Sequence, residues 1–501
     1  MSNAAPDPMT TDDGDDRIEL LRARRAQIRR EMGGLRKIER IHAEGRLTVR
    51  EYIELLVDAG SFRELGTFVA EPKAGADFWA QPGDGVIGGM AEIDGKSVVV
   101  CANDDTVRRG TNGPRGSKKF DRLYDAAESM GVPFIIFGQS SGGRLPENLQ
   151  SHKFAESGNP RGTFTKLLTR ARSFPVVMVI IGPSFGSSSF YSALSDFVVQ
   201  LSGTCLALTS PRVVEAATGE RIDMEELGGP RVQSEVTGQI DAVAQSPEES
   251  CQLVRAFLSY LPSSARSLLP LSSFENSHDD PEIVALVPSR RTRAYDVRKV
   301  MARLLDGGEY LEMKQKYGLS LVAALGRLCG VPVAVIANQP LHGAGALTPE
   351  ACRKATRLIC LADSLGIPIL YLVDNPGFLV GTVAEHTGAL SKAMEMLQVG
   401  ALASVPKCVV ILRKAFGLGF TVMGGGNEVG ADLTVAWPGA EVGFMDPKVA
   451  ANVLFAGEAE ELSPDERAGY LAGRATQLAS DFAPYGLSLI HISEPTRQAE
   501  I

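Results

Sequence analysis

The chain has 501 residues, of which 44% are hydrophobic and 22% charged. This length predicts two or more domains, and the composition is that of a globular protein rather than a disordered one. The net charge of −9 gives no reason to expect nucleic-acid binding, and no apolar run is long enough to span a membrane. The seven cysteines form no CxxC pair and the six histidines no HExxH motif, so we expect no disulfide framework, no metal site and a cytoplasmic location.

The chain begins with a polar, acidic stretch, 1–16, that predicts a disordered tail. From 17 to 41, Arg, Glu and Leu recur at helical spacing, which predicts an amphipathic helical arm. Polar and Pro-rich segments between 262 and 290 indicate an interdomain linker.

An internal repeat is the most informative feature of the sequence. Residues 95–143 align without a gap to 330–378, at a shift of 235. The next segment repeats at a shift of 231, where Phe185-Gly186 matches Phe416-Gly417. One ancestral unit of about 200 residues, an ordinary domain size, has therefore been duplicated.

Both copies alternate short apolar runs with helical patterns. This alternation predicts an α/β fold in which parallel strands are joined by crossover helices. Ligands then belong beyond the carboxyl ends of the strands. The predicted strands are 97–103, 132–138 and 175–182 in the first copy, and 332–340, 367–374 and 407–414 in the second.

Two Gly-containing turns follow strands in each copy. They are 140–143 and 185–189 in the first copy, and 375–378 and 416–419 in the second. Backbone N–H groups at such strand-to-helix turns lack intrahelical partners, so two adjacent turns can form an oxyanion hole. Glycine also fits any tight turn, and a single turn would favour that simpler interpretation. Recurrence of the turns in the same order favours two holes.

The sequence resembles the carboxyltransferase subunits of biotin-dependent acyl-CoA carboxylases, of the propionyl-CoA or acetyl-CoA carboxylase type, in the crotonase superfamily. The resemblance runs from Arg17 to Gly486. It rests on HAEGRLTVREYIELLVDAGSFRELG (42–66), GDGVIGG (83–89), FGSSSFYSALSDFVV (185–199), VVEAATGE (213–220), GVPVAVIANQP (330–340), DNPGFLVGT (374–382), VILRKAFGLGF (410–420) and GADLTVAWPGAE (430–441).

This resemblance implies two crotonase-like (ClpP/crotonase) domains, assembled as a hexamer that is a dimer of trimers. It implies biotin on a separate carrier protein and a biotin carboxylase as partners. We therefore expect a disordered tail at 1–16, an acyl-CoA domain at 17–265, a linker at 266–285, a biotin domain at 286–486, and no nucleic-acid or membrane partner.

The implied reaction moves a carboxyl group from carboxybiotin to the α-carbon of an acyl-CoA. The resemblance implies that the first hole holds the thioester oxygen and the second the biotin oxygen. The implied catalytic residues are Gly143, Gly186 and Ser187 in the first hole and Phe378, Leu418 and Gly419 in the second. The implied substrate contacts around them are Gly142, Ser188, Gly377, Gly417 and Thr421.

A cluster of basic residues lies between the first two strands of the first copy. Its members could meet the phosphates of CoA, or they could simply be a solvated surface loop. They are Arg108, Arg109, Arg115, Lys118 and Lys119.

Several positions depart from the common family pattern. The turns read SSGGR (140–144), FGSSS (185–189) and GLGFT (417–421), Thr421 replaces a common Asp, and Lys392-Ala393 replaces a His-Gly pair. Two alternatives stay open: a decarboxylase subunit acting on a malonyl-type CoA, and a non-catalytic scaffold of the same fold. The last segment, 487–501, has the character of an artefactual tail on a truncated domain.

Overall fold

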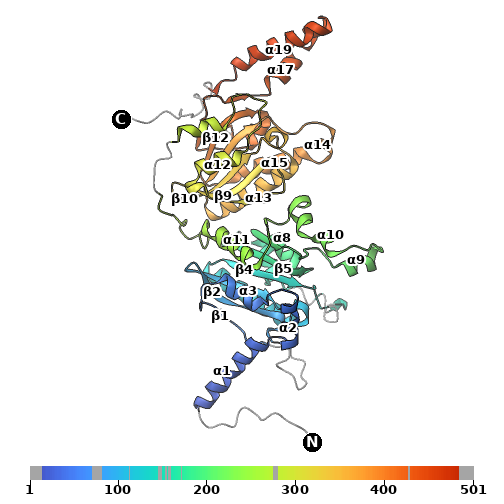
Figure 1. The fold of residues 1–501 in the computed structure, drawn as a ribbon, viewed down its shortest axis with the longest axis vertical. Coiled ribbons are helices and arrows are strands. Elements are labelled where there is room, and N and C mark those ends of the chain that lie inside the picture. The colour runs from blue at the N-terminus through green and yellow to red at the C-terminus, as the bar shows by residue number, and fades with distance from the viewer. Residues whose placement is uncertain are drawn as a thin grey trace. The chain divides into compact units, whose positions relative to one another are not determined.

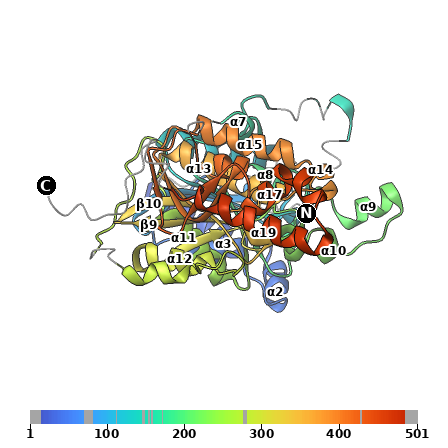
Figure 2. The same ribbon diagram turned by 90° about the horizontal axis from the view of Figure 1, so that it is seen from above.

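The computed structural model describes residues 14–69, 82–111, 113–144, 149–152, 155, 159–170, 172–274, 280–426 and 429–484. The segment 487–501 and most of the predicted 1–16 tail lie outside these residues. Two compact units share the chain (Figures 1 and 2). The first comprises Met1–Arg170, Phe174–Val232 and Val243–Arg255; the second comprises Ala171–Ser173, Gln233–Ala242 and Ala256–Ile501. The expected linker, 266–285, belongs by its contacts to the second unit, and the domain limits drawn from the sequence stay predictions.

The N-terminal arm is not the single helix that 17–41 predicts. Helix α1 (Gly14–Glu31) ends where Met32 and Gly34 adopt left-handed φ angles of 46° and 125°, and α2 (Leu35–Ala43) begins beyond them. Between them, Gly33 lies so close to Thr106 that a Cβ would collide with its carbonyl, and its N–H donates to the Thr106 hydroxyl. The break therefore follows from a tertiary contact that the helical spacing does not contain. A capping box at Thr48 and Glu51 then starts α3 (Val49–Leu56).

The first unit is built on a seven-stranded sheet in the order β1 to β7. The predicted parallel strands are confirmed as β3, β4 and β5, and β6 continues them, whereas β1 and β2 add an antiparallel edge. The strands are β1 Arg63–Glu64, β2 Val86–Ile93, β3 Lys96–Asn103, β4 Phe134–Ser140, β5 Val176–Ser184, β6 Phe197–Leu201 and β7 Ala242–Ala244. Its helices include α4 Pro114–Met130, α7 Thr163–Thr169, α8 Ser187–Leu194, α9 Pro211–Thr218, α10 Met224–Gly228 and α11 Pro247–Ser259.

The second unit repeats this plan. Its sheet runs β13-β12-β11-β10-β9-β8, with β14 also paired to β12, and the predicted strands appear as β10, β11 and β12. The strands are β8 Tyr310–Met313, β9 Leu321–Leu328, β10 Val331–Asn338, β11 Ile369–Asn375, β12 Lys407–Phe416, β13 Leu433–Ala436 and β14 Glu441–Gly443. The helices are α12 Val297–Leu304, α13 Pro349–Leu365, α14 Thr382–His386, α15 Ala389–Leu402, α16 Gly417–Val422, α17 Pro447–Leu454, α18 Ala456–Glu460 and α19 Pro464–Ser480.

Burial explains why the central strands read as unbroken apolar runs. Every residue of β4 and of β11 is buried. A parallel strand covered on both faces needs apolar side chains at successive positions, which removes the usual alternation. Within the part of the chain that the structure describes, no helix is long and apolar enough to cross a membrane.

The duplication extends to individual hydrogen bonds. Asn103 donates to the carbonyl of Gly110, and Asn338, its partner in the repeat, donates to the carbonyl of Gly345. Asp306 likewise accepts the two turn amides that follow β9, as Asp58 accepts those that follow β2. The last pair is separated by 248 residues, so the repeated unit reaches further toward the N-terminus than the aligned sequence, and α12 corresponds to α3.

Two buried lysines form a further matched pair. Lys119 Nζ donates to the carbonyl of Val86 at 2.8 Å, and Lys354 Nζ donates to the equivalent carbonyl of Leu321 at 2.8 Å. Burial lowers the pKa of each ammonium from 10.5 to about 8. The contact joins α4 to β2 in the first unit and α13 to β9 in the second, so both copies fix this helix to the first long strand of the sheet in the same way.

These lysines predict a pH-dependent stability. Between pH 8 and 10 the unfolded lysine holds a proton that the folded one releases, so stability rises with pH by up to about 1.4 kcal/mol per unit for each lysine. We therefore expect the melting temperature of the wild type, relative to that of Lys354→Met, to increase as the pH is raised from 8 to 10. Below pH 8 both states are protonated and the difference should be constant. If the difference in melting temperature between the two proteins stayed constant from pH 7 to 10, the pKa of Lys354 would not be lowered in the folded protein.

Candidate active site

The first turn pair lies where β4 and β5 end together. Ser140 and Ser184 are register partners at the ends of these strands. The carbonyl of Ser140 accepts the N–H of Phe185 at 3.0 Å, and its hydroxyl accepts the N–H of Gly142 at 3.2 Å. A Cβ on Gly186 would lie 3.4 Å from the Cα of Gly142, so the two turns are in contact. The adjacency that an oxyanion hole requires is therefore present in the first unit.

The hydrogen bonds change the expected roles of two residues. The N–H of Gly186 donates to the carbonyl of Leu208 at 3.2 Å, so this amide is committed within the protein. Ser188 is buried and its hydroxyl donates to Ser184 at 3.3 Å, which directs it into the core rather than toward a ligand. The other two expected donors of this turn pair are Gly143 and Ser187, and Ser187 is the first residue of α8.

The second turn pair lies at the ends of β11 and β12 and is joined by one side chain. Asn375 Oδ1 accepts the N–H of Gly377 at 2.7 Å, while its Nδ2 donates to the carbonyl of Gly419 at 3.1 Å. A Cβ on Gly419 would lie 2.8 Å from the Cα of Gly377, closer than real Cβ atoms approach. Glycine is therefore required at 419 for the two turns to meet, and Asn375 fixes their spacing.

The remaining candidates of the second unit surround this contact. Gly417 opens α16 with a left-handed φ of 53°, and a Cβ there would lie 2.7 Å from the carbonyl of Phe444. Leu418 is exposed, whereas Phe378 and Thr421 are half-buried. The first N–H groups of a helix have no intrahelical acceptor, so Leu418 and Gly419 can present amides beside Phe378.

A buried ion cluster holds the end of β11 in place. Asp374 is fully buried, and its carboxylate accepts from Arg413 Nε at 3.0 Å and lies 3.4 Å from Lys414 Nζ. It also accepts the backbone N–H of Lys414. Breaking such a buried pair on one side leaves an uncompensated charge, so the cluster fixes β11 against β12 directly before the turns. The sequence signal that could have indicated it is an Arg-Lys pair at the end of the apolar strand 407–414.

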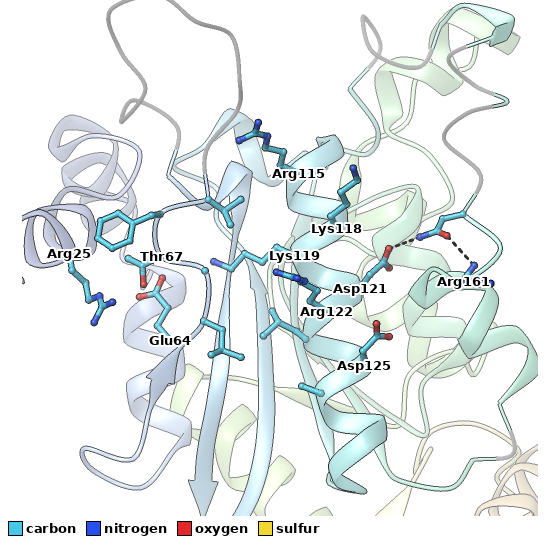
Figure 3. Close-up of a pocket in the computed structure, with 17 residues that line it drawn as sticks. Arg25, Glu64, Thr67, Arg115, Lys118, Lys119, Asp121, Arg122, Asp125 and Arg161 are labelled. Atoms are coloured by element: carbon cyan, nitrogen blue, oxygen red, sulfur yellow. Dashed lines mark hydrogen bonds between the residues drawn. The ribbon is translucent and has the colours of Figure 1, made fainter. Parts of the chain in front are cut away.

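The basic cluster expected to meet CoA does not form one patch. Arg109 lines a cavity of about 550 Å³ together with Ser140, Ser141 and Phe185 of the first turn pair. Arg115, Lys118 and Lys119, all on α4, instead line a second cavity of about 1,200 Å³ (Figure 3). Lys119 is buried there, and its ammonium donates a hydrogen bond to the carbonyl of Val86. The first cavity, which also includes Arg40 and Arg46, is therefore the one associated with the turns.

Arg108 and Arg109 have an unusual backbone. Their φ angles are 48° and 55°, and the corresponding positions of the second unit are Gly343 and Ala344, both at 56°. A left-handed conformation costs about 1 kcal/mol for a residue with a large side chain, and such residues concentrate at functional sites. The first unit therefore carries two arginines at left-handed positions where the second unit has Gly and Ala.

Among the described residues, no group of three or more His, Cys, Asp or Glu side chains could hold a metal ion. The chemistry that the described turns can perform is stabilisation of negative charge on oxygen by backbone amides. The duplicated crotonase-type fold is that of carboxyltransferase enzymes. The sequence matches the family described as "Carboxyl transferase domain" over residues 40–492, and the chain belongs to this carboxyltransferase family.

Relatives and solved structures agree with this assignment. The chain is 35% identical to the propionyl-CoA carboxylase carboxyltransferase subunit of Haloferax mediterranei, covering 90% of this chain and 88% of the relative. It is also 35% identical to the methylmalonyl-CoA carboxyltransferase 12S subunit of Propionibacterium freudenreichii, covering 88% and 83%. The methylmalonyl-CoA decarboxylase subunit alpha of Veillonella parvula is 33% identical, covering 88% and 86%. The crystal structure of transcarboxylase 12S superposes with a TM-score of 0.89 at 31% identity, covering 97% of this chain and 94% of that one.

Asn375 gives a stability test of the second turn pair. Asn375→Ala should destabilise the protein by about 1–3 kcal/mol, because it leaves the N–H of Gly377 and the carbonyl of Gly419 without their partner. Hydrogen exchange at Gly377 should accelerate more than exchange elsewhere in the second unit. Asn452→Ala, which removes an exposed bond to Lys448, is the matched control and should have little effect. Equal melting temperatures for the two variants would show that Asn375 does not hold the turns.

Proposed function

We propose that the chain transfers a carboxyl group from carboxybiotin on a carrier protein to the α-carbon of an acyl-CoA, with one backbone oxyanion hole in each unit. The observation that carries this proposal is the pair of contacting turns at equivalent strand ends of both units, Gly142 with Gly186 and Gly377 with Gly419. The reaction passes through two oxyanions, one derived from the thioester and one from the biotin ureido group. Two donor sites on one duplicated chain match that requirement.

The first unit is assigned to the acyl-CoA. Amides at Gly143 and Ser187 would polarise the thioester carbonyl and stabilise the enolate that forms when the α-proton leaves. Each well-placed donor of this kind contributes about 3 kcal/mol to transition-state stabilisation. The cavity beside these turns carries Arg40, Arg46 and Arg109, whose guanidinium groups suit the phosphates of CoA.

The second unit is assigned to biotin. Because Gly419 carries no Cβ, the turns of Gly377 and Gly419 meet closely and could present their backbone to a flat ureido group. Carboxybiotin, when bound, would supply both the carboxyl group, released as its N–C bond breaks, and the nitrogen that takes the α-proton before the new C–C bond forms. The chain then needs no side-chain base, and its contribution is to hold the biotin oxygen with the amides of Leu418 and Gly419 beside Phe378.

The assembly and partners follow from the same assignment. We propose a hexamer, because the transcarboxylase 12S structure that superposes on this chain is described as a hexamer assembly. A biotin carboxylase and a biotin carboxyl carrier protein would supply the carboxylated biotin in the cytoplasm. A carboxylation assay across acetyl-, propionyl-, longer and branched acyl-CoAs, with both partners supplied, tests the function. Release of CO₂ from a malonyl-type CoA without forward transfer would instead favour the decarboxylase alternative.

Gly419→Val tests the biotin hole. The valine side chain would enter the space now occupied by Gly377 and Asn375 and displace the turn. Because a misplacement of about 1 Å can reduce a rate about a hundredfold, we expect transfer to collapse while acyl-CoA binding persists. Activity is measured with free biotin as acceptor, and acyl-CoA binding by calorimetry.

Two further variants complete this test. Gly439→Val is the matched control, because a Cβ at Gly439 meets no atom within 4 Å. Ser187→Pro removes an amide at a helix position where proline is tolerated, so it should impair turnover of acyl-CoA without unfolding α8. Full transfer activity in Gly419→Val would mean that the second turn pair does not bind biotin.

Arg109→Glu tests the assignment of the first cavity. The change keeps a long side chain at a left-handed position and reverses one charge beside the turns, so acyl-CoA affinity should fall about tenfold at low salt and less at high salt. Calorimetry with propionyl-CoA measures it. Lys299→Glu, an exposed charge reversal on α12 of the second unit, is the control. Unchanged acyl-CoA affinity in Arg109→Glu would show that this arginine does not contribute to CoA binding.

A further inference from the structure

A buried arginine directly follows the first oxyanion turn. Arg144 is bonded in the chain to Gly143, one of the donors proposed for the thioester oxygen, and its side chain is only 4% exposed. Its guanidinium lies 2.7 Å from a carboxylate oxygen of Asp84, which is fully buried. The proposed reaction uses neither side chain. An ion pair that is costly to bury therefore stands beside the site without a role.

The guanidinium of Arg144 joins the turn to the loop that follows β3. Its Nε donates to the hydroxyl of Thr111 at 3.3 Å, and its Nη2 donates to the carbonyls of Thr111 and Asp84 at 3.1 and 3.3 Å. At the other end of the turn, the N–H of Ser141 donates to the carbonyl of Arg109 at 3.3 Å. The loop that carries Arg109 is thus bonded to both ends of the turn.

Asp84 connects the same arrangement to α4. Its Oδ2 accepts the N–H groups of Arg115 and Gly116 at 3.1 and 2.8 Å, at the start of that helix. Its backbone is left-handed, with φ 49° and ψ 39°, which Asp tolerates better than most residues but at some cost in free energy. The N-cap of α4 is Gly113, where a Cβ would collide with Arg144. The helix, the ion pair and the turn are therefore in direct contact.

The second unit has leucines at this place. At the shift of 235, Asp84 and Arg144 correspond to Leu319 and Leu379, and the bounds of β2 and β9 keep the same shift. A backbone bond holds the second turn instead, because the N–H of Leu379 donates to the carbonyl of Leu347 at 3.1 Å. The repeated fold therefore forms without an ion pair here, and the pair belongs to what distinguishes the first turn.

We propose that Arg144, held by Asp84, is a positioning residue for the first oxyanion turn. It fixes the N–H of Gly143 relative to the loop of Arg109, so that the oxyanion hole and the cation assigned to CoA keep one spacing. A misplacement of about 1 Å can reduce a rate about a hundredfold, so such a link has a direct effect on transfer. The inference rests on the assignment of the first turn pair to the thioester oxygen.

The carbonyl stretch of bound propionyl-CoA tests this role directly. Infrared difference spectra are recorded with the full chain and propionyl-CoA isotope-labelled at the thioester carbonyl. In the wild type, hydrogen-bond donors at the carbonyl oxygen should lower its stretching frequency from the value in free propionyl-CoA. Arg144→Leu introduces the residue of the second unit, and it should return the frequency most of the way to the free value. Its kcat for carboxyl transfer should fall about a hundredfold, and its acyl-CoA affinity by no more than about tenfold.

Two conservative variants and one control accompany this change. Arg144→Lys keeps the charge but not the forked donors, so its frequency should lie between those of the wild type and Arg144→Leu, and it serves if the leucine variant does not fold. Asp84→Asn keeps the shape of the partner and should shift the frequency in the same direction. Arg170→Leu is the control, because Arg170 forms another buried ion pair of the first unit, 2.7 Å from Asp196 at the start of β5. It should leave the frequency unchanged even where it lowers the melting temperature.

The outcomes separate this inference from the proposed function. If the wild type lowers the carbonyl frequency and both Arg144 variants lower it equally, Arg144 does not position the turn, and the proposed function stands. If the wild type binds propionyl-CoA at its free frequency, the first turn pair is not the thioester hole, and both proposals are wrong. An equal loss of the frequency shift in Arg170→Leu would overturn the inference in favour of general destabilisation.

Discussion

The structure depends on one irregularity in strand pairing that occurs in both units. The register between the two central parallel strands shifts between Gly138 and Ser140 in the first unit and between Val373 and Asn375 in the second. A bulge of this kind bends a strand and redirects the turn at its end. Both strands of each pair then end together, and their turns emerge side by side. Every candidate donor in the protein is placed by this local departure from regular pairing.

The irregularity is maintained by a close backbone approach. In the first unit the carbonyl of Gln139, within the irregularity, lies so near Gly110 that a Cβ there would collide with it. In the second unit the carbonyl of Asp374 lies similarly close to Gly345. Both glycines have left-handed φ angles, 63° and 84°, and both follow the strand that ends in the matched asparagine. The loop after the preceding strand therefore holds the bulge, and the duplicated asparagine holds that loop.

The two copies share this backbone but differ in the side chains around it. In the first unit the Ser140 hydroxyl accepts only the N–H of Gly142 in its own turn, and its carbonyl accepts the N–H of Phe185. The neutral side chain of Gln139 accepts a hydrogen bond from Arg46. In the second unit Asn375 spans both turns, and a buried carboxylate at Asp374 is neutralised by Arg413 and Lys414. The first turn pair is therefore bordered by the half-buried Arg46, paired with Glu44 and Asp105, and by the exposed Arg109, whereas the cations of the second lie inside the fold. This difference suits a phosphorylated ligand in one unit and an uncharged ring in the other.

The sequence by itself determined the duplication, the six parallel strands and the four turns, because apolar runs and glycines report local requirements that short segments satisfy alone. Only the tertiary structure decided which amides and cations are available. The arm breaks at Met32 and Gly34 because Thr106 packs against Gly33, and the N–H of Gly186 is bonded to Leu208. The basic cluster divides between two cavities, and Lys119 is buried with its ammonium bonded to the carbonyl of Val86. Each of these outcomes depends on a contact between segments far apart in the chain, and the residue pattern within one segment cannot predict such a contact.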